Sequence, residues 1–228
     1  MLKAISGISL SMMVLAGCSS GEEAGGPAAS PPSPSAQSSQ SAESARLRAA
    51  LLPVPKGMSI AYGPELGAFG SLKSIQQGLA AIRQAKLQRP ECAGAAQLDA
   101  AQPDVAAAPA AVIAFSAARG SITQAVVAMP AETFPQTLPK QCASYTAEVS
   151  GTRVTYKTKA LDMPAKGDQS RAYLTTAAGG EKNAQIGSVM IRRGTLIMSM
   201  LVVGQRVKQQ GLFELARLAD QNLARVTR

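Results

Sequence analysis

Residues 195–203 read TLIMSMLVV, a run that is apolar at every position except Thr195 and Ser199. Successive side chains of a strand point to opposite faces of its sheet, so a strand of this composition is apolar on both faces. Such a strand must be covered on two sides. We expect helices to cover one face, and either a second layer of chain or an apolar cavity to cover the other.

The segments around this run also have the composition of strands and are bounded by turn residues. An extended piece is expected at 58–62, and turns are expected at Gly120, Gly179 and Gly194. The expected strands are 111–116, 122–129, 153–161, 170–177, 185–192 and 195–203. Because short turns join most of them, the sequence predicts a largely antiparallel sheet of about six strands.

Apolar residues recur with helical spacing in two segments, 71–86 and 209–226. A short helix is expected at 45–52, where Pro53 ends it, and a proline-interrupted helix is expected at 131–145. Helices that cover one face of an antiparallel sheet make an α+β domain. The predicted fold class is therefore α+β, with the sheet flanked by helices and closed by one disulfide.

The first 17 residues have the features of a bacterial lipoprotein signal peptide. Lys3 precedes the uncharged stretch 4–14, which is shorter than the run of about 20 apolar residues that a membrane-spanning helix needs. The tetrapeptide LAGC then ends at Cys18 and looks like a lipobox, in which the cysteine thiol receives a diacylglycerol. A chance tetrapeptide before an ordinary soluble domain is the alternative. We expect residues 1–17 to be removed and Cys18 to hold the chain on the outer face of the cytoplasmic membrane, since two acyl chains anchor a protein stably.

A low-complexity segment follows Cys18. Residues 19–45 are rich in Ser, Ala and Pro and contain no aromatic or branched aliphatic side chain. Such a segment cannot bury enough apolar surface to offset the entropy lost on ordering. We expect a lipidated, disordered tether over 18–45 and one extracytoplasmic domain over 46–228.

The 228 residues include no histidine, which excludes Ser-His-Asp triads, Cys-His dyads and HExxH zinc sites. The sequence also lacks an SxxK element, a GxSxG elbow, a P-loop and a GxGxxG motif. In an exported domain, Cys92 and Cys142 should form a structural disulfide, since the sequence has no CxxC pair. We therefore expect a non-enzyme that holds no metal or other cofactor. Nucleic acid is not an expected partner, because no basic and aromatic residues are interleaved.

The chain is basic, with 23 Lys and Arg against 14 Asp and Glu. Arg153, Lys157 and Lys159 share one face of an expected strand. Together with Arg192 and Arg193, they form the candidate surface for an anionic ligand, such as lipid headgroups, phosphorylated glycans or acidic wall polymers. The alternative, which we favour, is a set of solvated charges that keeps a surface protein soluble.

Several segments stand in an order that resembles a known family. After the lipobox and the tether come residues 51–58 (LLPVPKGM), a Cys before the first hairpin and another after a helix, residues 166–173 (KGDQSRAY) and residues 191–197 (IRRGTLI). The chain resembles actinobacterial cell-envelope lipoproteins whose outer domain is similar to the PknH-like extracellular sensor domain of a receptor Ser/Thr protein kinase. The resemblance implies an antiparallel sheet flanked by helices, a disulfide between the helical region and the segment before the sheet, and a cleft for ligands. The kinase sensor has two disulfides, whereas this domain can form one, and no binding residues transfer.

Two hypotheses follow, beside a third, an envelope hydrolase, which the missing catalytic motifs disfavour. The first is a membrane-anchored extracytoplasmic lipoprotein that acts as a non-enzymatic ligand-binding or sensor-like module, with an envelope protein as a further partner. The alternative is a lipid or glycolipid carrier, with an apolar cavity and a basic surface for anionic headgroups. Met198 and Met200 could line such a cavity, although filling a core is the more common role of Met. A void on the second face of 195–203 would favour the carrier.

Overall fold

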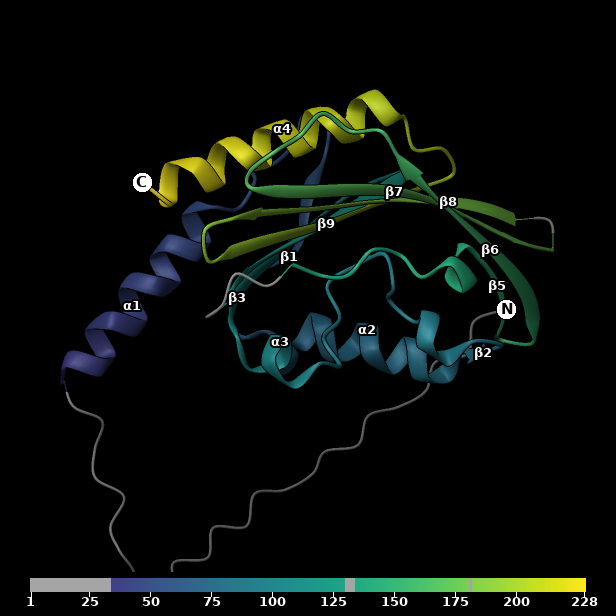
Figure 1. The fold of residues 1–228 in the computed structure, drawn as a ribbon, viewed down its shortest axis with the longest axis horizontal. Helices are drawn as coiled ribbons and strands as arrows, with labels where there is room; N and C mark the ends of the chain where they lie inside the picture. Colours follow the sequence, from purple (N-terminus) through teal and green to yellow (C-terminus); the bar gives the residue numbers. More distant parts are fainter. Residues whose placement is uncertain (1–33, 130–133, 181) are drawn as a thin grey trace, which may run out of the picture. The chain divides into compact units, whose positions relative to one another are not determined.

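A large antiparallel sheet forms the centre of the molecule, with helices on both of its faces (Figure 1). The structure, a computed structural model, describes residues 34–129, 134–180 and 182–228. Within these ranges the sheet has nine strands in the order β1-β3-β4-β9-β8-β7-β6-β5-β2. They are β1 (Ser59–Ala68), β2 (Lys86–Leu87), β3 (Pro109–Ala117), β4 (Gly120–Ala128), β5 (Ser144–Val149), β6 (Thr152–Leu161), β7 (Gln169–Gly179), β8 (Lys182–Arg193) and β9 (Leu196–Gly204).

Helix α4 (Gln209–Val226) and the C-terminal end of α1 (Pro34–Ala49) cover the first face of this sheet, while the rest of α1 extends away from it; a layer of shorter elements covers the second face (Figure 1). The second face carries α2 (Lys73–Gln84) and α3 (Pro103–Ala107). Three short 3-10 helices complete the second layer: η1 (Phe69–Ser71), η2 (Pro90–Cys92) and η3 (Lys140–Ala143). The α+β class is confirmed, but helices flank both faces instead of one.

The apolar strand β9 lies in the middle of the sheet, between β4 and β8. Its Met198 and Met200 side chains are completely buried under α1 and α4, in a core that also contains Phe115, Leu212 and Leu223. Its opposite face is covered in two different ways. Ile197 packs into a second core with Phe69, Val112 and Val127, whereas Leu201 faces a pocket. The expectation that both faces of this strand need cover is confirmed up to Leu201, whereas Val203 at the end of the second face is 36% exposed.

Close approach of α4 to the sheet depends on Gly187 in β8. A Cβ atom at this position would lie 2.9 Å from Cγ1 of Val207 and 3.0 Å from Cδ2 of Leu212. Both distances are shorter than ordinary van der Waals contact, so a larger residue would require the Val207 and Leu212 side chains to shift.

The expected strand number was too low. Strand β1 was expected only as a short extended piece, because Gly63, Pro64 and Gly67 interrupt its pattern. Its register with β3 shifts between Ile60 and Tyr62 and again between Tyr62 and Glu65. Strand β2 has two residues, too few for any sequence pattern. Strand β5 falls partly in the helix expected at 131–145.

That expected helix is wrong over its described part. Residues 134–139 form neither helix nor strand, η3 follows, and β5 begins at Ser144. Pro135 and Pro139 lack the amide hydrogen that a helix interior requires, which explains the extended course of this segment.

Helix α1 begins at Pro34, earlier than the expected start at Ala45. Residues 35–52 contain neither Pro nor Gly, so each added residue extends the helix with one further hydrogen bond. The last part of the expected tether is therefore helical, while residues 18–33 of it lie outside the described residues. Across the described ranges, we find no helix with the length and hydropathy that crossing a membrane requires.

Candidate functional site

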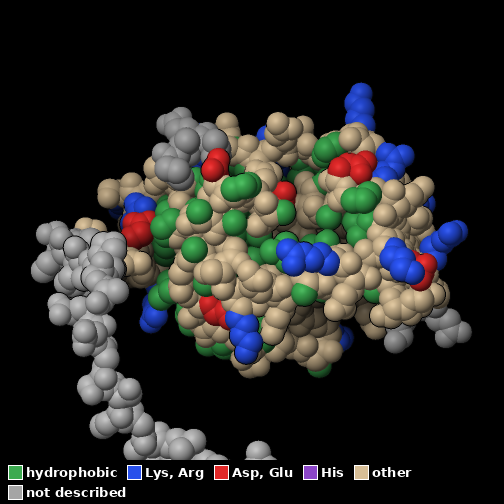
Figure 2. Space-filling model, turned by 90° about the horizontal axis from the view of Figure 1, so that it is seen from below, with side chains coloured by type: hydrophobic (Ala, Val, Ile, Leu, Met, Phe, Trp, Pro, Cys, Tyr) green, Lys and Arg blue, Asp and Glu red, His purple; other side chains and the backbone are tan. Residues whose placement is uncertain are grey.

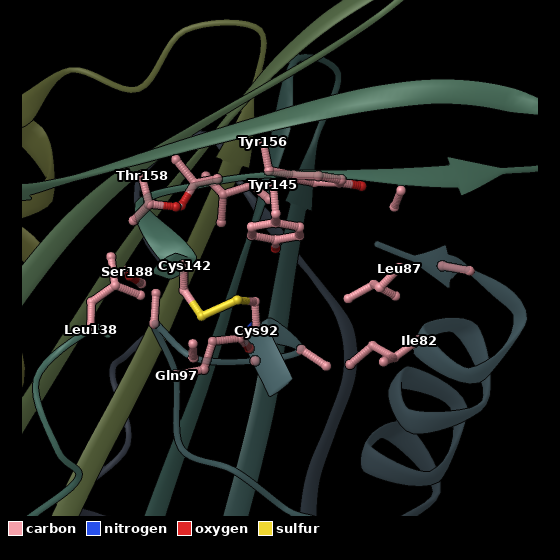
Figure 3. A pocket seen from close by; sticks show the side chains of 18 of the residues that line it. Ile82, Leu87, Cys92, Gln97, Leu138, Cys142, Tyr145, Tyr156, Thr158 and Ser188 are labelled. Atoms are coloured by element: carbon pink, nitrogen blue, oxygen red, sulfur yellow. A yellow bond between two sulfur atoms is a disulfide. The ribbon is translucent and has the colours of Figure 1, made fainter. Parts of the chain in front are cut away.

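A pocket of about 320 Å³ lies against the second face of the sheet, beside the disulfide (Figure 3). Its floor is formed by side chains from β5, β6, β7, β8 and β9, and its walls by the C-terminal end of α2, by β2 and by the segment 92–97. Its wall and floor residues include Ala81, Ile82, Ala85, Leu87, Cys92, Leu138, Cys142, Tyr145, Tyr156, Thr158, Thr175, Ser188 and Leu201. Figure 2 looks onto this side of the molecule, where hydrophobic side chains lie among isolated charged ones.

The disulfide forms part of the pocket wall. Cys92 and Cys142 are joined, as expected, with both residues almost completely buried and their Cα atoms 5.3 Å apart. Leu138 approaches the pocket from the same side, and its backbone N–H donates a hydrogen bond to the Tyr173 hydroxyl at 3.2 Å. The hydrogen bond to Tyr173 of β7 and the disulfide together hold the segments around Leu138 and Cys92 over the sheet.

Three hydroxyl groups lie on the floor, on adjacent strands. The Thr158 and Thr175 hydroxyl oxygens, from β6 and β7, are 2.8 Å apart and share one hydrogen bond. Ser188 in β8 is 3% exposed, and its hydroxyl has no hydrogen-bond partner among the described residues. Buried polar groups are nearly always paired, so an unpaired hydroxyl on a pocket floor is a candidate contact for a ligand.

Two tyrosines form the part of the floor nearest the sheet edge. The rings of Tyr145 and Tyr156 stack with their centroids 5.0 Å apart and their planes 12° from parallel (Figure 3). Burial raises the pKa of the Tyr145 phenol above its ordinary value of 10.0, and repulsion from Tyr156 raises it further. Tyr145 is therefore uncharged at physiological pH.

No Lys, Arg, Asp or Glu side chain of the described residues lines this pocket. Ala81, Ile82 and Ala85 belong to the C-terminal end of α2, where the helix dipole places a partial negative charge. The pocket thus offers a neutral, mainly apolar environment with a few hydroxyl groups.

The structure separates the five residues of the expected anionic-ligand surface. Arg153, Lys157 and Lys159 are exposed on the first face of β6, away from the pocket. Arg192 is 8% exposed and points to the second face, while the Arg193 guanidinium pairs with Asp220 of α4 at 2.9 Å. A surface of three lysine and arginine side chains remains, and it does not meet the pocket.

Met198 and Met200 do not line the pocket, because they point to the first face and fill its core. Cys18, the expected lipidation site, lies outside the described residues. Across the part of the chain that the structure describes, there is no group of three or more His, Cys, Asp or Glu side chains that could hold a metal ion.

The pocket residues were not singled out in the sequence, although a signal exists for some of them. Thr158 lies on the face of its strand opposite the lysines, and Ser188 is a lone hydroxyl within the apolar run 186–191. A polar residue at an inward position of a buried strand marks either a hydrogen bond or a site. The contributions of Leu87 and Leu138 could not be inferred, because they depend on how distant segments pack.

No protein-family model and no curated protein matches the sequence. Among solved structures, the chain is similar to the extracellular domain of PknH from Mycobacterium tuberculosis, with a TM-score of 0.56 and 19% identity over 80% of this chain and 95% of that one. A putative uncharacterized protein from Mycobacterium smegmatis, the Rv0999 ortholog, matches over the same shares with a TM-score of 0.48 and 12% identity. The resemblance noted in the sequence is confirmed for the fold: this chain is built like the extracellular domain of PknH.

Proposed function

We propose that this protein is a non-enzymatic, extracytoplasmic ligand-binding module, sensor-like in its domain and anchored to the membrane through Cys18. The observation that carries the proposal is the pocket beside the Cys92–Cys142 disulfide, with a buried hydroxyl on its floor that no described residue satisfies. Its volume of about 320 Å³ falls within the range of small-molecule sites. An extracellular location is supported by the disulfide and by the extracellular domain that shares this fold.

The chemistry of the pocket supports binding over catalysis. Ser188 would need a neighbouring base to act as a nucleophile. The described residues that line the pocket include no carboxylate and no lysine, and the chain has no histidine. Hydroxyl groups in an apolar pocket can orient a ligand, but they supply no group that transfers protons near neutral pH.

One observation favours the carrier as a second candidate. Leu201 on the second face of β9 lines the pocket, so that face is partly open. The face is closed toward the N-terminal end of β9, where Ile197 is 1% exposed inside the second core. A pocket near the lower end of the range of about 300–1,000 Å³ suits a small molecule better than a glycolipid with two acyl chains.

Filling the pocket mouth tests the binding function. We expect Ala81→Trp to abolish the fluorescence enhancement of anilinonaphthalene, an uncharged dye, because the indole would occupy space that the dye needs. The dye is titrated into the exported chain Ser19–Arg228, produced without an acyl anchor so that no detergent is present. Loss of the signal corresponds to an apparent Kd raised at least about tenfold, a change of at least about 1.4 kcal/mol.

Ala80→Trp is the matched control, since Ala80 is also exposed on α2 but does not line the pocket. This variant should bind the dye like the parent. Dye binding that is absent from the parent, or equal in both Trp variants, would refute the pocket as the binding site.

The anchor has its own test. We expect Cys18→Ser to abolish incorporation of labelled palmitate and to remove the protein from the membrane fraction, because no thiol would remain at the lipobox. Cys142→Ser should keep the label and serves as the control for loss of a cysteine. An unlabelled parent protein with Met1 intact in the cytosolic fraction would contradict the proposed anchor.

A further inference from the structure

We propose that the pocket selects an uncharged amphipathic molecule: an aliphatic or aromatic body with one hydroxyl, carbonyl or ether group that contacts the floor. This inference rests on the proposed function of the pocket as a ligand site and adds the class of the ligand. The proposed ligand differs from the anionic ligand expected for the basic residues, because those residues do not line the pocket.

Among the described residues the lining carries no charge, which disfavours ionised ligands on energetic grounds. Moving an ionised group out of water without a partner is far more unfavourable than moving a neutral polar group. No charged side chain of the described residues lines the pocket to compensate. For an anion, the C-terminal end of α2 adds repulsion, because its last turn, around Ala81 and Ile82, forms one wall.

The arrangement of the hydroxyls indicates where the polar group of the ligand would lie. Thr158 is paired with Thr175 across β6 and β7, and Ser188 lies diagonally from Thr175 across β7 and β8. When two hydroxyls share one hydrogen bond, one hydrogen remains free to be donated, and oxygen lone pairs remain free to accept. The Ser188 hydroxyl adds a further donor and acceptor. A ligand group that donates a hydrogen bond, accepts one or does both is therefore suited to these three hydroxyls.

The rest of the pocket suits an apolar body. Leu87, Leu138 and Leu201 contribute aliphatic surface, and Tyr145 contributes an aromatic edge. Apolar surface removed from water stabilises a complex by about 25 cal/mol per Å². Affinity would thus come from these walls, and orientation from the hydroxyls.

Three octyl compounds with different head groups test the class. Octanol, octanoate and octylammonium are used at pH 7 to displace anilinonaphthalene from the chain Ser19–Arg228. We expect octanol to displace the dye at a concentration at least about tenfold lower than either ion requires, since the ions must enter a pocket without a counter-charge. Displacement of the dye is assigned to the pocket only if Ala81→Trp abolishes the dye signal.

A positive charge introduced at the mouth should improve displacement by octanoate. Ile82 is 36% exposed and lines the pocket, so Ile82→Lys places an ammonium beside a bound head group. Octanoate should then displace the dye better than it does in the parent, whereas Ile82→Gln should leave octanoate weak. Equal or better displacement by octanoate or octylammonium from the parent protein would overturn the uncharged class, and so would no displacement by any of the three. Dye binding that is sensitive to Ala81→Trp would still support the pocket itself.

Ser188→Ala separates a ligand contact from a structural role. Because the hydroxyl has no partner among the described residues, its removal should leave the protein equally or more stable to urea. The same change should weaken octanol binding by about threefold to tenfold, through loss of one hydrogen bond. Ser199→Ala, at a buried position on the same face that does not line the pocket, should leave octanol binding unchanged. Loss of stability in Ser188→Ala without weaker binding would refute the proposed contact.

Discussion

Replacing Cys92 and Cys142 together by alanine is expected to lower the free energy of unfolding by about 4 kcal/mol, because the disulfide closes a loop of 50 residues. Closing a loop of this length restricts the unfolded chain, which raises its free energy relative to the folded state. Both residues are almost completely buried, so the alanine side chains would also leave space in the wall of the pocket. Urea denaturation of the chain Ser19–Arg228 measures the change.

The same double variant should lose dye binding under conditions where the sheet remains folded. The segment around Cys92 has little regular structure, with η2 and a few turn hydrogen bonds within its own length. The segment that leads to Cys142 likewise forms only η3 before β5 begins. The disulfide is therefore the link that joins these two walls to each other, while the Leu138–Tyr173 hydrogen bond ties one of them to β7.

Treatment of the parent protein with a thiol reductant provides the matched control, since it breaks the bond and leaves both sulfur atoms in place. Thiol titration of the denatured parent before reduction should find no free thiol from this pair. A double variant whose free energy of unfolding falls within about 1 kcal/mol of the parent would contradict the role given to the disulfide.

The elements that could be predicted are those whose patterns are local. The alternation in β6 and the apolar run of β9 indicate strands, and the apolar stripe in 209–226 indicates α4, because each pattern extends over several residues of one element. The disulfide followed from the expected oxidising compartment and from the cysteine count. Strand β1 was underestimated because its glycines and its proline interrupt the alternation that marks a strand.

The site could not be predicted because it is assembled from segments far apart in the chain. The pocket joins α2 to strands that begin about 60 residues later, and nothing in the spacing of Ile82 or Thr158 reports their proximity. The alternation of side chains along a strand could, however, have corrected the prediction of the basic surface. Arg192 and Arg193 are neighbours in β8, so they point to opposite faces and cannot belong to one surface.

Ile197→Ala should mainly lower stability, whereas Leu201→Ala should mainly weaken dye binding, although both residues lie on the second face of β9. Ile197 is 1% exposed in the second core, and its truncation should lower the free energy of unfolding by about 3 kcal/mol through lost burial and a new cavity. Leu201 is half-buried beside an existing pocket, so its truncation enlarges that pocket and should lower the free energy by about 1 kcal/mol or less. Urea denaturation measures both changes.

For dye binding, Leu201→Ala should have the larger effect. Ile197→Ala should bind anilinonaphthalene like the parent at urea concentrations where it remains folded, whereas Leu201→Ala should bind it more weakly, because the leucine supplies part of the apolar contact area. Val202→Ala is the control for Leu201, since Val202 is half-buried on the opposite face and packs against the first core. If Ile197→Ala and Leu201→Ala lowered stability equally without weakening dye binding, the second face of β9 would be a continuous core, and the pocket would have no role in binding.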